Sequence, residues 1–295
     1  MSRAGLLVVD KPAGWTSHDV VARVRKLAGT RRVGHAGTLD PMATGVLLVG
    51  LEQATRLLGH LAAQDKRYDA TICLGVTTSS DDAEGEVIDE RDATALTDDA
   101  IVAALDAQRG RLSQVPPAVS AVKVDGVRSY RKAREGKTVD LAPRDVTVHE
   151  LMELAVRRNA TTVELDVSVH CSTGTYIRAI ARDVGAALGV GGHLTALRRT
   201  ALGQYDVTRA RPLDDIDVDR DLIPLNAAAA AAFARWDVDD ELAARIRTGA
   251  KLPAQGLPPG PVAAFDCDGA LLALVTDDPD ADRLRYLAVF SPTRP

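Results

Sequence analysis

Residues 34–41 bring three chemically useful side chains together in one glycine-containing segment. They read Gly34-His35-Ala36-Gly37-Thr38-Leu39-Asp40-Pro41, which combines an imidazole, a hydroxyl and a carboxylate. Glycines let a loop backbone approach a ligand closely, and catalytic groups are often carried on such loops. Asp40 is therefore the candidate catalytic carboxylate. A turn or a helix cap is the commoner role of an aspartate before proline, and this alternative stays open here.

Arg178 is the second candidate for chemistry. We expect it in the first turn of a helix that follows Thr175. A guanidinium at that place can bind both oxygens of a carboxylate and keep the carboxylate ionised in a dry site. An arginine at the edge of the core that binds backbone carbonyls is the alternative.

The sequence lacks the common signatures of cofactor and metal sites. Gly189-Val190-Gly191-Gly192 does not have the spacing of a dinucleotide-binding loop, and there is no P-loop. The six histidines form no H-x-x-x-H or H-x-E pair, and the three cysteines form no C-x-x-C pair. The acidic residues 81–84 are expected to solvate a turn rather than to bind Mg²⁺. By elimination, the sequence predicts a carboxylate enzyme with no cofactor and no metal.

The spacing of apolar residues predicts the elements that hold these candidates. Helices show apolar residues three and four apart, and half-buried strands show alternation. The expected elements are a strand at 6–9, a helix that Ser17 caps and Gly29 ends, strands at 67–74 and 161–170, an exposed acidic turn at 81–92, a helix that begins at Thr97 and a helix after Thr175.

The order of these elements predicts an α+β fold. Strands and helices follow one another without a regular βαβ rhythm, which favours a mixed, largely antiparallel sheet with flanking helices. From Asp237 onward, prolines and glycines lead to short alternating strands at 262–265, 271–275 and 286–290. This part resembles a small β-barrel module. We therefore expect one domain at residues 1–236 and a second at residues 237–295.

Charge is unevenly distributed along the 295 residues. The whole chain has a net charge of -5, but residues 81–106, 206–241 and 266–282 together carry -21, which leaves +16 for the rest. Residues 109–137 hold eight Lys or Arg against two acids, around Ser129 and Tyr130. A basic stretch of this kind can bind a polyanion such as RNA, although a solvated helix face is the alternative.

The chain is not expected to cross a membrane. No apolar run approaches the roughly 18 residues that a spanning helix needs. The first ten residues reach Asp10 before a signal-peptide core can form. We therefore expect a cytoplasmic protein.

Six ordered motifs identify a family resemblance. The motifs are Lys11-Pro12-Ala13-Gly14-Trp15-Thr16-Ser17, Gly34 to Pro41, Lys66-Arg67-Tyr68 with Leu74-Gly75 and Thr78-Ser79-Ser80-Asp81, Pro116-Pro117-Ala118-Val119-Ser120-Ala121-Val122-Lys123-Val124-Asp125-Gly126 with Tyr130 and Ala133-Arg134, Gly174-Thr175-Tyr176-Ile177-Arg178, and His193-Leu194 with Leu197-Arg198-Arg199-Thr200 and Gly203. With these motifs in this order, the sequence resembles the TruB-type bacterial tRNA pseudouridine synthases, which modify uridine 55 in the T arm of tRNA.

The resemblance implies roles for three residues in the reaction. Asp40 is the expected nucleophile, and Arg178 is the expected partner of its carboxylate. Tyr68 matches the tyrosine that stacks on the flipped base and is suited to removing the proton from C5. The resemblance does not decide whether Asp40 attacks C1′ or C6.

It also implies substrate contacts and partners. Tyr176 and Leu197 match residues that line the uracil pocket, and His35 matches the histidine that fills the space left by the flipped nucleotide. Lys11 is expected to bind substrate as well. The expected partner is the T stem-loop of tRNA, with no obligate protein partner, and the protein is expected to be a monomer. The expected fold is that of pseudouridine synthases, followed by an RNA-binding barrel of the PUA type.

Two other functions stay open at this point. A tRNA-binding module that has lost catalysis would lack Asp40 or Arg178, and both are present. A related synthase that acts on ribosomal RNA, or that partner proteins guide, is the second alternative. The bacterial-type motifs and the absence of a basic tail count against it.

Overall fold

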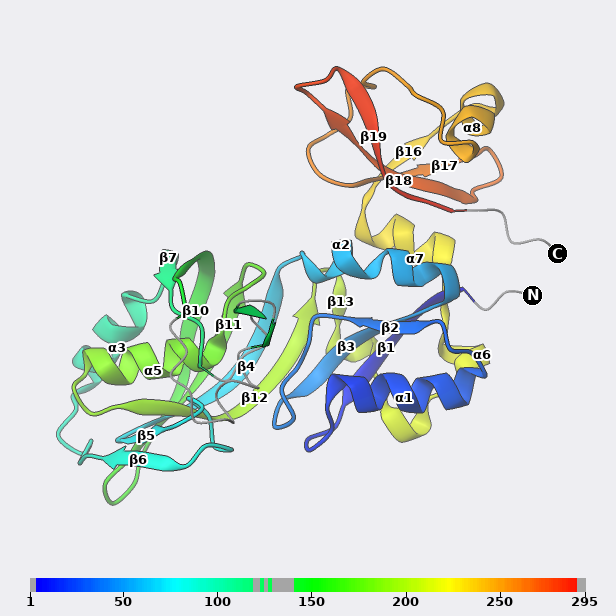
Figure 1. Ribbon diagram of the computed structural model, residues 1–295. Coiled ribbons are helices and arrows are strands. Elements are labelled where there is room, and N and C mark those ends of the chain that lie inside the picture. Colours follow the sequence, from blue (N-terminus) through cyan, green and yellow to red (C-terminus); the bar gives the residue numbers. More distant parts are fainter. Residues whose placement is uncertain (1–3, 119–122, 125–126, 129–140, 291–295) are drawn as a thin grey trace. The chain divides into compact units, whose positions relative to one another are not determined.

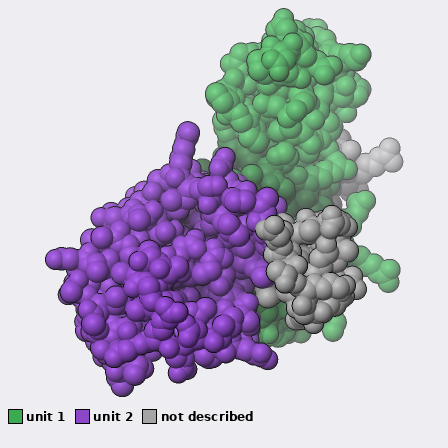
Figure 2. Space-filling model, turned by 60° about the vertical axis from the view of Figure 1, so that its left-hand side comes forward, with its two compact units in different colours: residues 1–41, 45–63, 202–295 green, residues 42–44, 64–201 purple. Residues whose placement is uncertain are grey.

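The structure is a computed structural model that describes residues 4–118, 123–124, 127–128 and 141–290. The chain divides into two compact units, shown in green and purple in Figure 2. Unit 1 comprises residues 1–41, 45–63 and 202–295, and unit 2 comprises residues 42–44 and 64–201. The prediction of a basic surface at residues 109–137 falls largely outside the described residues.

The elements that lie wholly or mainly in unit 1 are strands connected by short helices (Figure 1). Their bounds are β1 Gly5–Lys11, α1 Ser17–Ala28, β2 Val33–Ala36, β3 Thr44–Leu51, η1 Glu52–Arg56, α2 Leu58–Ala62, β13 Tyr205–Asp206, η2 Val207–Arg209, β14 Arg211–Pro212, η3 Leu213–Asp215, α6 Val218–Asp221, β15 Ile223–Pro224, α7 Leu225–Ala232, β16 Ala234–Asp237, α8 Asp240–Arg247, β17 Val262–Phe265, β18 Leu271–Asp278 and β19 Arg283–Val289. Strand β1 pairs antiparallel with β3 and parallel with β14, and β2 pairs antiparallel with β3.

The elements of unit 2 centre on long antiparallel strands (Figure 1). Their bounds are β4 Lys66–Leu74, β5 Val76–Thr78, β6 Val87–Glu90, α3 Asp98–Asp106, β7 Gly110–Gln114, β8 Lys123–Val124, β9 Val127–Arg128, β10 Arg144–Arg158, β11 Val163–Cys171, α5 Ile177–Ala187 and β12 Gly192–Leu202. Strand β11 pairs antiparallel with both β4 and β10, and β10 pairs antiparallel with β7. Helices α3 and α5 contact each other and pack against β10 and β4.

These pairings confirm the predicted α+β class with a large mixed sheet. Within the described part of the chain, eleven strands belong to one sheet. Its β1–β14 pair is parallel, whereas the pairs β1–β3, β2–β3, β4–β11, β10–β11 and β7–β10 are antiparallel. The alternation in β4 and β11 is confirmed too. Tyr68, Ala70 and Ile72 are buried in β4, while Val163 and Val169 are buried in β11. Side chains of a strand alternate between its faces, so this pattern was readable in advance.

The predicted closed barrel at the C-terminus is not confirmed. In the described residues, strands β16, β17, β18 and β19 form an open sheet in that order. Both faces of this sheet are apolar. Ala263 and Phe265 join a core cluster with Leu6 of β1, whereas Val262 packs in a second cluster with Ile246 of α8. A barrel encloses one interior. This sheet instead separates two cores.

The boundary predicted between residues 236 and 237 stays a prediction. Unit 1 contains residues from both sides of that position, and one core cluster includes both Ala228 and Phe290. None of the helices in the described ranges combines the length and the apolar character that a bilayer-spanning helix needs.

Candidate functional site

Asp40 lies in the loop between β2 and β3, and Ser17 holds the backbone directly before it. The buried hydroxyl of Ser17 donates to the carbonyl of Leu39 (3.1 Å) and accepts a hydrogen bond from its N–H (2.9 Å). A buried backbone group that loses its partner costs about 1–3 kcal/mol, so this double contact fixes the loop strongly. Leu39 is itself 3% exposed. The candidate carboxylate therefore follows a residue whose backbone and side chain are both anchored.

Lys11 and Gly14 hold Pro41, the residue directly after the candidate carboxylate. Lys11 is fully buried, and its ammonium donates to the carbonyl oxygens of Pro12 (2.9 Å), Trp15 (2.6 Å) and Pro41 (3.1 Å). The N–H of Gly14 also donates to the Pro41 carbonyl (2.9 Å). The predicted contact between Lys11 and substrate stays a prediction. In the structure, its ammonium ties the first motif to the loop of the second.

The helix that carries Ser17 begins differently from the expectation. Thr16 is the N-cap, and it forms a capping box with Asp19. The Thr16 side chain accepts a hydrogen bond from the Asp19 N–H (3.1 Å), and the Asp19 carboxylate accepts one from the Thr16 N–H (2.9 Å). The prediction of Ser17 as the cap was wrong by one residue. Because Thr16 caps the helix, the Ser17 hydroxyl is available for Leu39.

His35 and a surface cavity complete the unit 1 part of the candidate site. The His35 ring lies edge-on to the ring of His18, with 5.4 Å between the centroids. A cavity of about 530 Å³ lies beside α1, and its lining combines Trp15, Arg23 and Lys26 with the acidic Asp19 and Asp214. The cations and the aromatic ring suit a phosphate backbone or a base, whereas the two carboxylates oppose phosphate.

Tyr68 lies on the buried face of β4 and shares the interior of unit 2 with two cations. Tyr68 is 6% exposed and Arg199 of β12 is fully buried. Burial lowers the pKa of Arg199, while its hydrogen bond with Tyr68 acts in the opposite direction.

Lys66 is the second buried cation near Tyr68, and its ammonium donates a hydrogen bond to the carbonyl of Gln64 (2.7 Å). Burial, together with the charge of Arg199, lowers the pKa of Lys66 to about 8. Lys66 and Arg199 stand in the family motifs, but their residue types alone pointed to no role in the site.

Arg178 lies in the first turn of α5 and forms an ion pair with Asp82. Its Nη1 is 3.2 Å from Oδ2 of Asp82 and donates to the carbonyl of Ser80 (2.9 Å). The two paired side chains are only 5% and 4% exposed. Residues 81–92 were expected to form an exposed turn, and this expectation was wrong for Asp82. It was also wrong for Asp81, which pairs with Arg182 at 3.1 Å and whose pKa is raised by burial.

The predicted pairing of Arg178 with Asp40 stays a prediction, since the two residues belong to different units. Tyr176 of unit 2 directly precedes α5, and Gln114 fixes its backbone. The Tyr176 N–H donates to Oε1 of Gln114 (2.8 Å), and Nε2 of Gln114 donates to the Tyr176 carbonyl (3.1 Å). No sequence pattern pointed to Gln114, because a glutamine at the end of a strand fits many roles.

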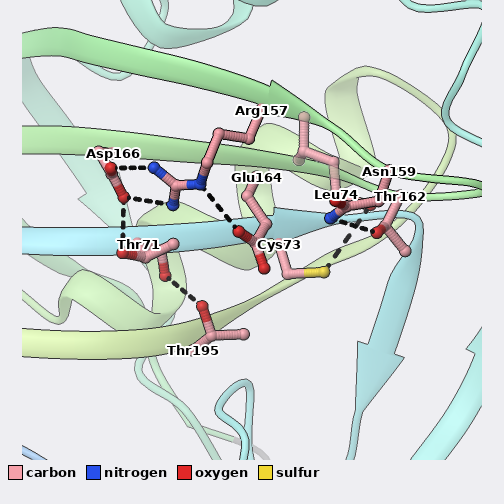
Figure 3. Close-up of polar contacts among 9 residues, drawn as sticks. All are labelled: Thr71, Cys73, Leu74, Arg157, Asn159, Thr162, Glu164, Asp166 and Thr195. Atoms are coloured by element: carbon pink, nitrogen blue, oxygen red, sulfur yellow. Dashed lines mark hydrogen bonds and ion pairs between the residues drawn. The ribbon is translucent and has the colours of Figure 1, made fainter.

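Leu197 lines a cavity of about 470 Å³ within unit 2. Polar side chains on neighbouring strands form part of its wall (Figure 3). Thr71 donates to Oδ1 of Asp166 (2.8 Å), and Thr195 donates to the Thr71 carbonyl (3.2 Å). Asp166 also pairs with Arg157, whose hydrogen bond lowers the pKa of the carboxyl group. The cavity thus combines an apolar residue with hydroxyl and carboxylate groups, a lining suited to a small polar ring.

Comparison with known proteins decides the family. Residues 25–177 match the model of the TruB family pseudouridylate synthase N-terminal domain. Residues 178–220 match that of the tRNA pseudouridylate synthase B C-terminal domain, and residues 233–291 match tRNA pseudouridine synthase II, C terminal. This chain belongs to the TruB family. The predicted family resemblance is therefore confirmed.

Curated TruB relatives align with nearly the whole chain. A protein of Streptomyces griseus named tRNA pseudouridine synthase B is 52% identical over 97% of both chains. The protein of the same name from Thermobifida fusca is 55% identical over 92% of this chain and 93% of its own. That of Mycobacterium bovis is 51% identical over 98% of this chain and 96% of its own.

Solved structures share the fold of this TruB chain. The crystal structure of a Cbf5-Nop10-Gar1 complex contains a chain with a TM-score of 0.69 and 28% identity, over 92% of this chain and 77% of that one. A chain in an H/ACA RNP bound to a substrate RNA containing 2′-deoxyuridine has a TM-score of 0.73, with 24% identity over 98% of this chain and 86% of that one, and shows the fold alone.

Proposed function

We propose that this chain is a tRNA pseudouridine synthase that isomerises uridine 55 in the T arm of tRNA. The observation that carries the proposal is the similarity to proteins named tRNA pseudouridine synthase B, with 52% identity over 97% of both chains. Its excess of positive charge outside three acidic stretches suits an RNA substrate.

The reaction moves the attachment of uracil from N1 to C5. The N1–C1′ bond breaks, the base turns, a C5–C1′ bond forms, C5 loses its proton and N1 gains one. Atoms and electrons balance without an oxidant or reductant. Because positive charge develops on the sugar and negative charge on the base, a fixed carboxylate beside C1′ can stabilise or trap the sugar. Attack of the carboxylate at C6 of the base is the alternative first step.

Asp40 is the nucleophile in this proposal. The hydrogen bonds of Ser17 to Leu39 and of Lys11 to Pro41 support the assignment, because they fix the backbone on both sides of Asp40. A preorganised carboxylate spends no free energy on reorientation during the reaction. Arg178 keeps the carboxylate ionised in this proposal.

The remaining predicted residues bind the flipped nucleotide. Tyr68 stacks on the base and removes the C5 proton, while Tyr176 and Leu197 line the uracil pocket. His35 occupies the space that the nucleotide leaves. Flipping exposes a glycosidic bond that stacking hides, and it costs on the order of a few kcal/mol that these contacts recover.

In this proposal the protein acts on the T stem-loop of tRNA without a protein partner. It does so as a monomer in the cytoplasm. Residues 237–295 add RNA contacts to the catalytic part at residues 1–236. The names of the relatives support tRNA as the substrate.

Tritium release from C5-labelled uridine in a T-arm hairpin tests the proposal. The native protein should release tritium and convert uridine to pseudouridine, and Asp40→Asn should do neither while it still binds the hairpin. The matched control is Asp99→Asn, which makes the same change at an exposed carboxylate and should leave release unchanged. Binding without release by the native protein would favour a binding module, and full activity of Asp40→Asn would reject Asp40 as the nucleophile.

A further inference from the structure

Two histidines and an aspartate from three chain segments converge on the exposed side of unit 2. Asp65 directly precedes β4, His149 lies in β10 and His170 lies in β11. Oδ2 of Asp65 is 3.1 Å from Nε2 of His149 and 3.8 Å from Nε2 of His170. Among the described residues, these three side chains are the cluster whose ligand atoms all lie within 4.8 Å of one another. Both imidazoles thus point at one carboxylate oxygen.

The strand register explains why these residues meet. Strand β11 lies between its two partners, and His170 is paired with Arg67 on one side and with Glu150 on the other. Asp65 comes two residues before Arg67 in the chain. The register between β10 and β11 shifts between Val148 and Glu150, so His149 is an additional residue on its strand. A bulge of this type redirects a side chain, which places His149 on the same side as His170.

We propose that Asp65, His149 and His170 form a binding site for a divalent transition-metal ion, with Zn²⁺ as the first choice. Two imidazole nitrogens and one carboxylate oxygen are a common donor set for zinc sites that keep a position for water. Zinc bonds of about 2.0–2.2 Å at tetrahedral angles place ligand atoms roughly 3.4 Å apart. The two distances to Asp65 lie on either side of this value. The His149 side chain is 37% exposed and can move to complete the set.

The charges around the cluster also suit a cation. Metal binding needs neutral imidazoles and an ionised carboxylate. Asp65 supplies a negative charge. The cationic Arg67 faces the cluster, but it donates a hydrogen bond to Glu150 (3.1 Å), whose carboxylate offsets its charge. One histidine would be enough for an ion pair with Asp65. Here both His149 and His170 approach the same oxygen, Oδ2 of Asp65, which is the arrangement of a ligand set.

Isothermal titration of the full-length protein with ZnCl₂ tests the site. The Cys267→Ser variant is the starting protein, because the exposed Cys267 thiol lies 3.1 Å from Oδ1 of Asp240 and is a competing zinc ligand. We expect one ion per chain with a dissociation constant on the order of micromolar. Introducing His149→Ala or His170→Ala into the Cys267→Ser protein should weaken zinc binding by at least about tenfold.

The matched control is Asp145→Asn, which removes an exposed carboxylate from the same strand as His149 and should leave zinc affinity unchanged. The same Zn²⁺ concentration should raise the melting temperature of the starting protein, as any ligand of the native state does, and raise that of His149→Ala by less. Equal zinc affinity in all variants, or no saturable binding below about 1 mM, would overturn the site.

Copper provides a readout that does not depend on affinity. Electron paramagnetic resonance of one equivalent of Cu²⁺, which prefers the same imidazole donors, should show coupling to two nitrogens in the starting protein and to one in His149→Ala. His149 is exposed, so this variant should fold. Coupling that is unchanged in both histidine variants would contradict the assignment.

Discussion

Lys66 links the stability of the protein to pH through a single buried ammonium. Burial and the charge of Arg199 lower its pKa from 10.5 to about 8. Between these two values, the unfolded chain holds a proton at Lys66 that the folded chain has lost. Stability therefore rises with pH across this window, by up to about 3 kcal/mol. Below pH 8 the cost of the buried charge is fully present, and above about 10.5 it is relieved.

Urea unfolding of the native protein and of Lys66→Met at pH 7.5, 9 and 10.5 measures this effect. Because the other groups titrate alike in both proteins, the difference between the two unfolding free energies isolates the contribution of Lys66. It should favour Lys66→Met most at pH 7.5 and shrink as pH rises. A difference that does not depend on pH would show that Lys66 titrates with its ordinary pKa.

Asp82 shows why buried acidic residues could not be told from exposed ones by the sequence alone. Ten acids lie between residues 81 and 106, and such a run usually lies in solvent. Asp82 is instead 3% exposed, because it forms an ion pair with Arg178 of α5, almost a hundred residues later in the chain. The sequence contained both residues, but nothing local pointed to their pairing. Residue types and spacing singled out Asp40 and Arg178 but left a structural alternative open for each. The motifs of the family supplied their roles and added Tyr68.

At the scale of elements, the start of α1 is coupled to the candidate nucleophile. The capping box of Thr16 fixes the helix, and the next residue, Ser17, holds both backbone groups of Leu39. Replacing Ser17 with alanine removes both hydrogen bonds, which should cost about 1–3 kcal/mol of stability. The Asp40 loop then loses its fixed geometry. We expect kcat for pseudouridine formation to fall by about tenfold or more, with little change in RNA affinity.

The control for Ser17→Ala is Ser113→Ala, which removes an exposed hydroxyl from β7. Melting temperature, kcat and the dissociation constant for the hairpin should be measured for both. An unchanged kcat in Ser17→Ala, despite a lower melting temperature, would show that the serine supports folding but not the reaction.

Elements that depend on local patterns were predicted well, and those that depend on distant contacts were not. Alternation in β4 and β11 gave the correct strands and buried faces, because side-chain period follows directly from backbone geometry. The open C-terminal sheet was missed because one of its two cores is completed by β1 and α7. The Asp65, His149 and His170 cluster was invisible for the same reason. The cluster requires three strands in register and a register shift between Val148 and Glu150. The spacing of residues in the sequence does not predict such a shift.

At the scale of the whole molecule, the distribution of charge matters more than its sum. A net charge of -5 should repel RNA, but three acidic stretches account for -21 and the rest of the chain carries +16. Attraction to phosphates acts over about 8–10 Å at physiological salt, so separate basic regions can bind RNA although the total is negative. Residues 109–137, with eight Lys and Arg against two acids, are one such region in the sequence.

RNA affinity should therefore fall steeply with salt. Each phosphate contact adds about -0.7 to -0.9 to the slope of log K against log salt concentration. Replacing both Arg131 and Lys132 with glutamine should reduce the magnitude of the slope by about two and weaken binding uniformly across RNA sequences. The matched control is a double change of Arg209 and Arg220 to glutamine, two exposed arginines that lie in an acidic stretch outside that segment. Hairpin affinities measured between 50 and 300 mM KCl give the slopes. A flat salt dependence in the native protein, or equal slopes in the two double variants, would show that binding does not depend on charge in residues 109–137.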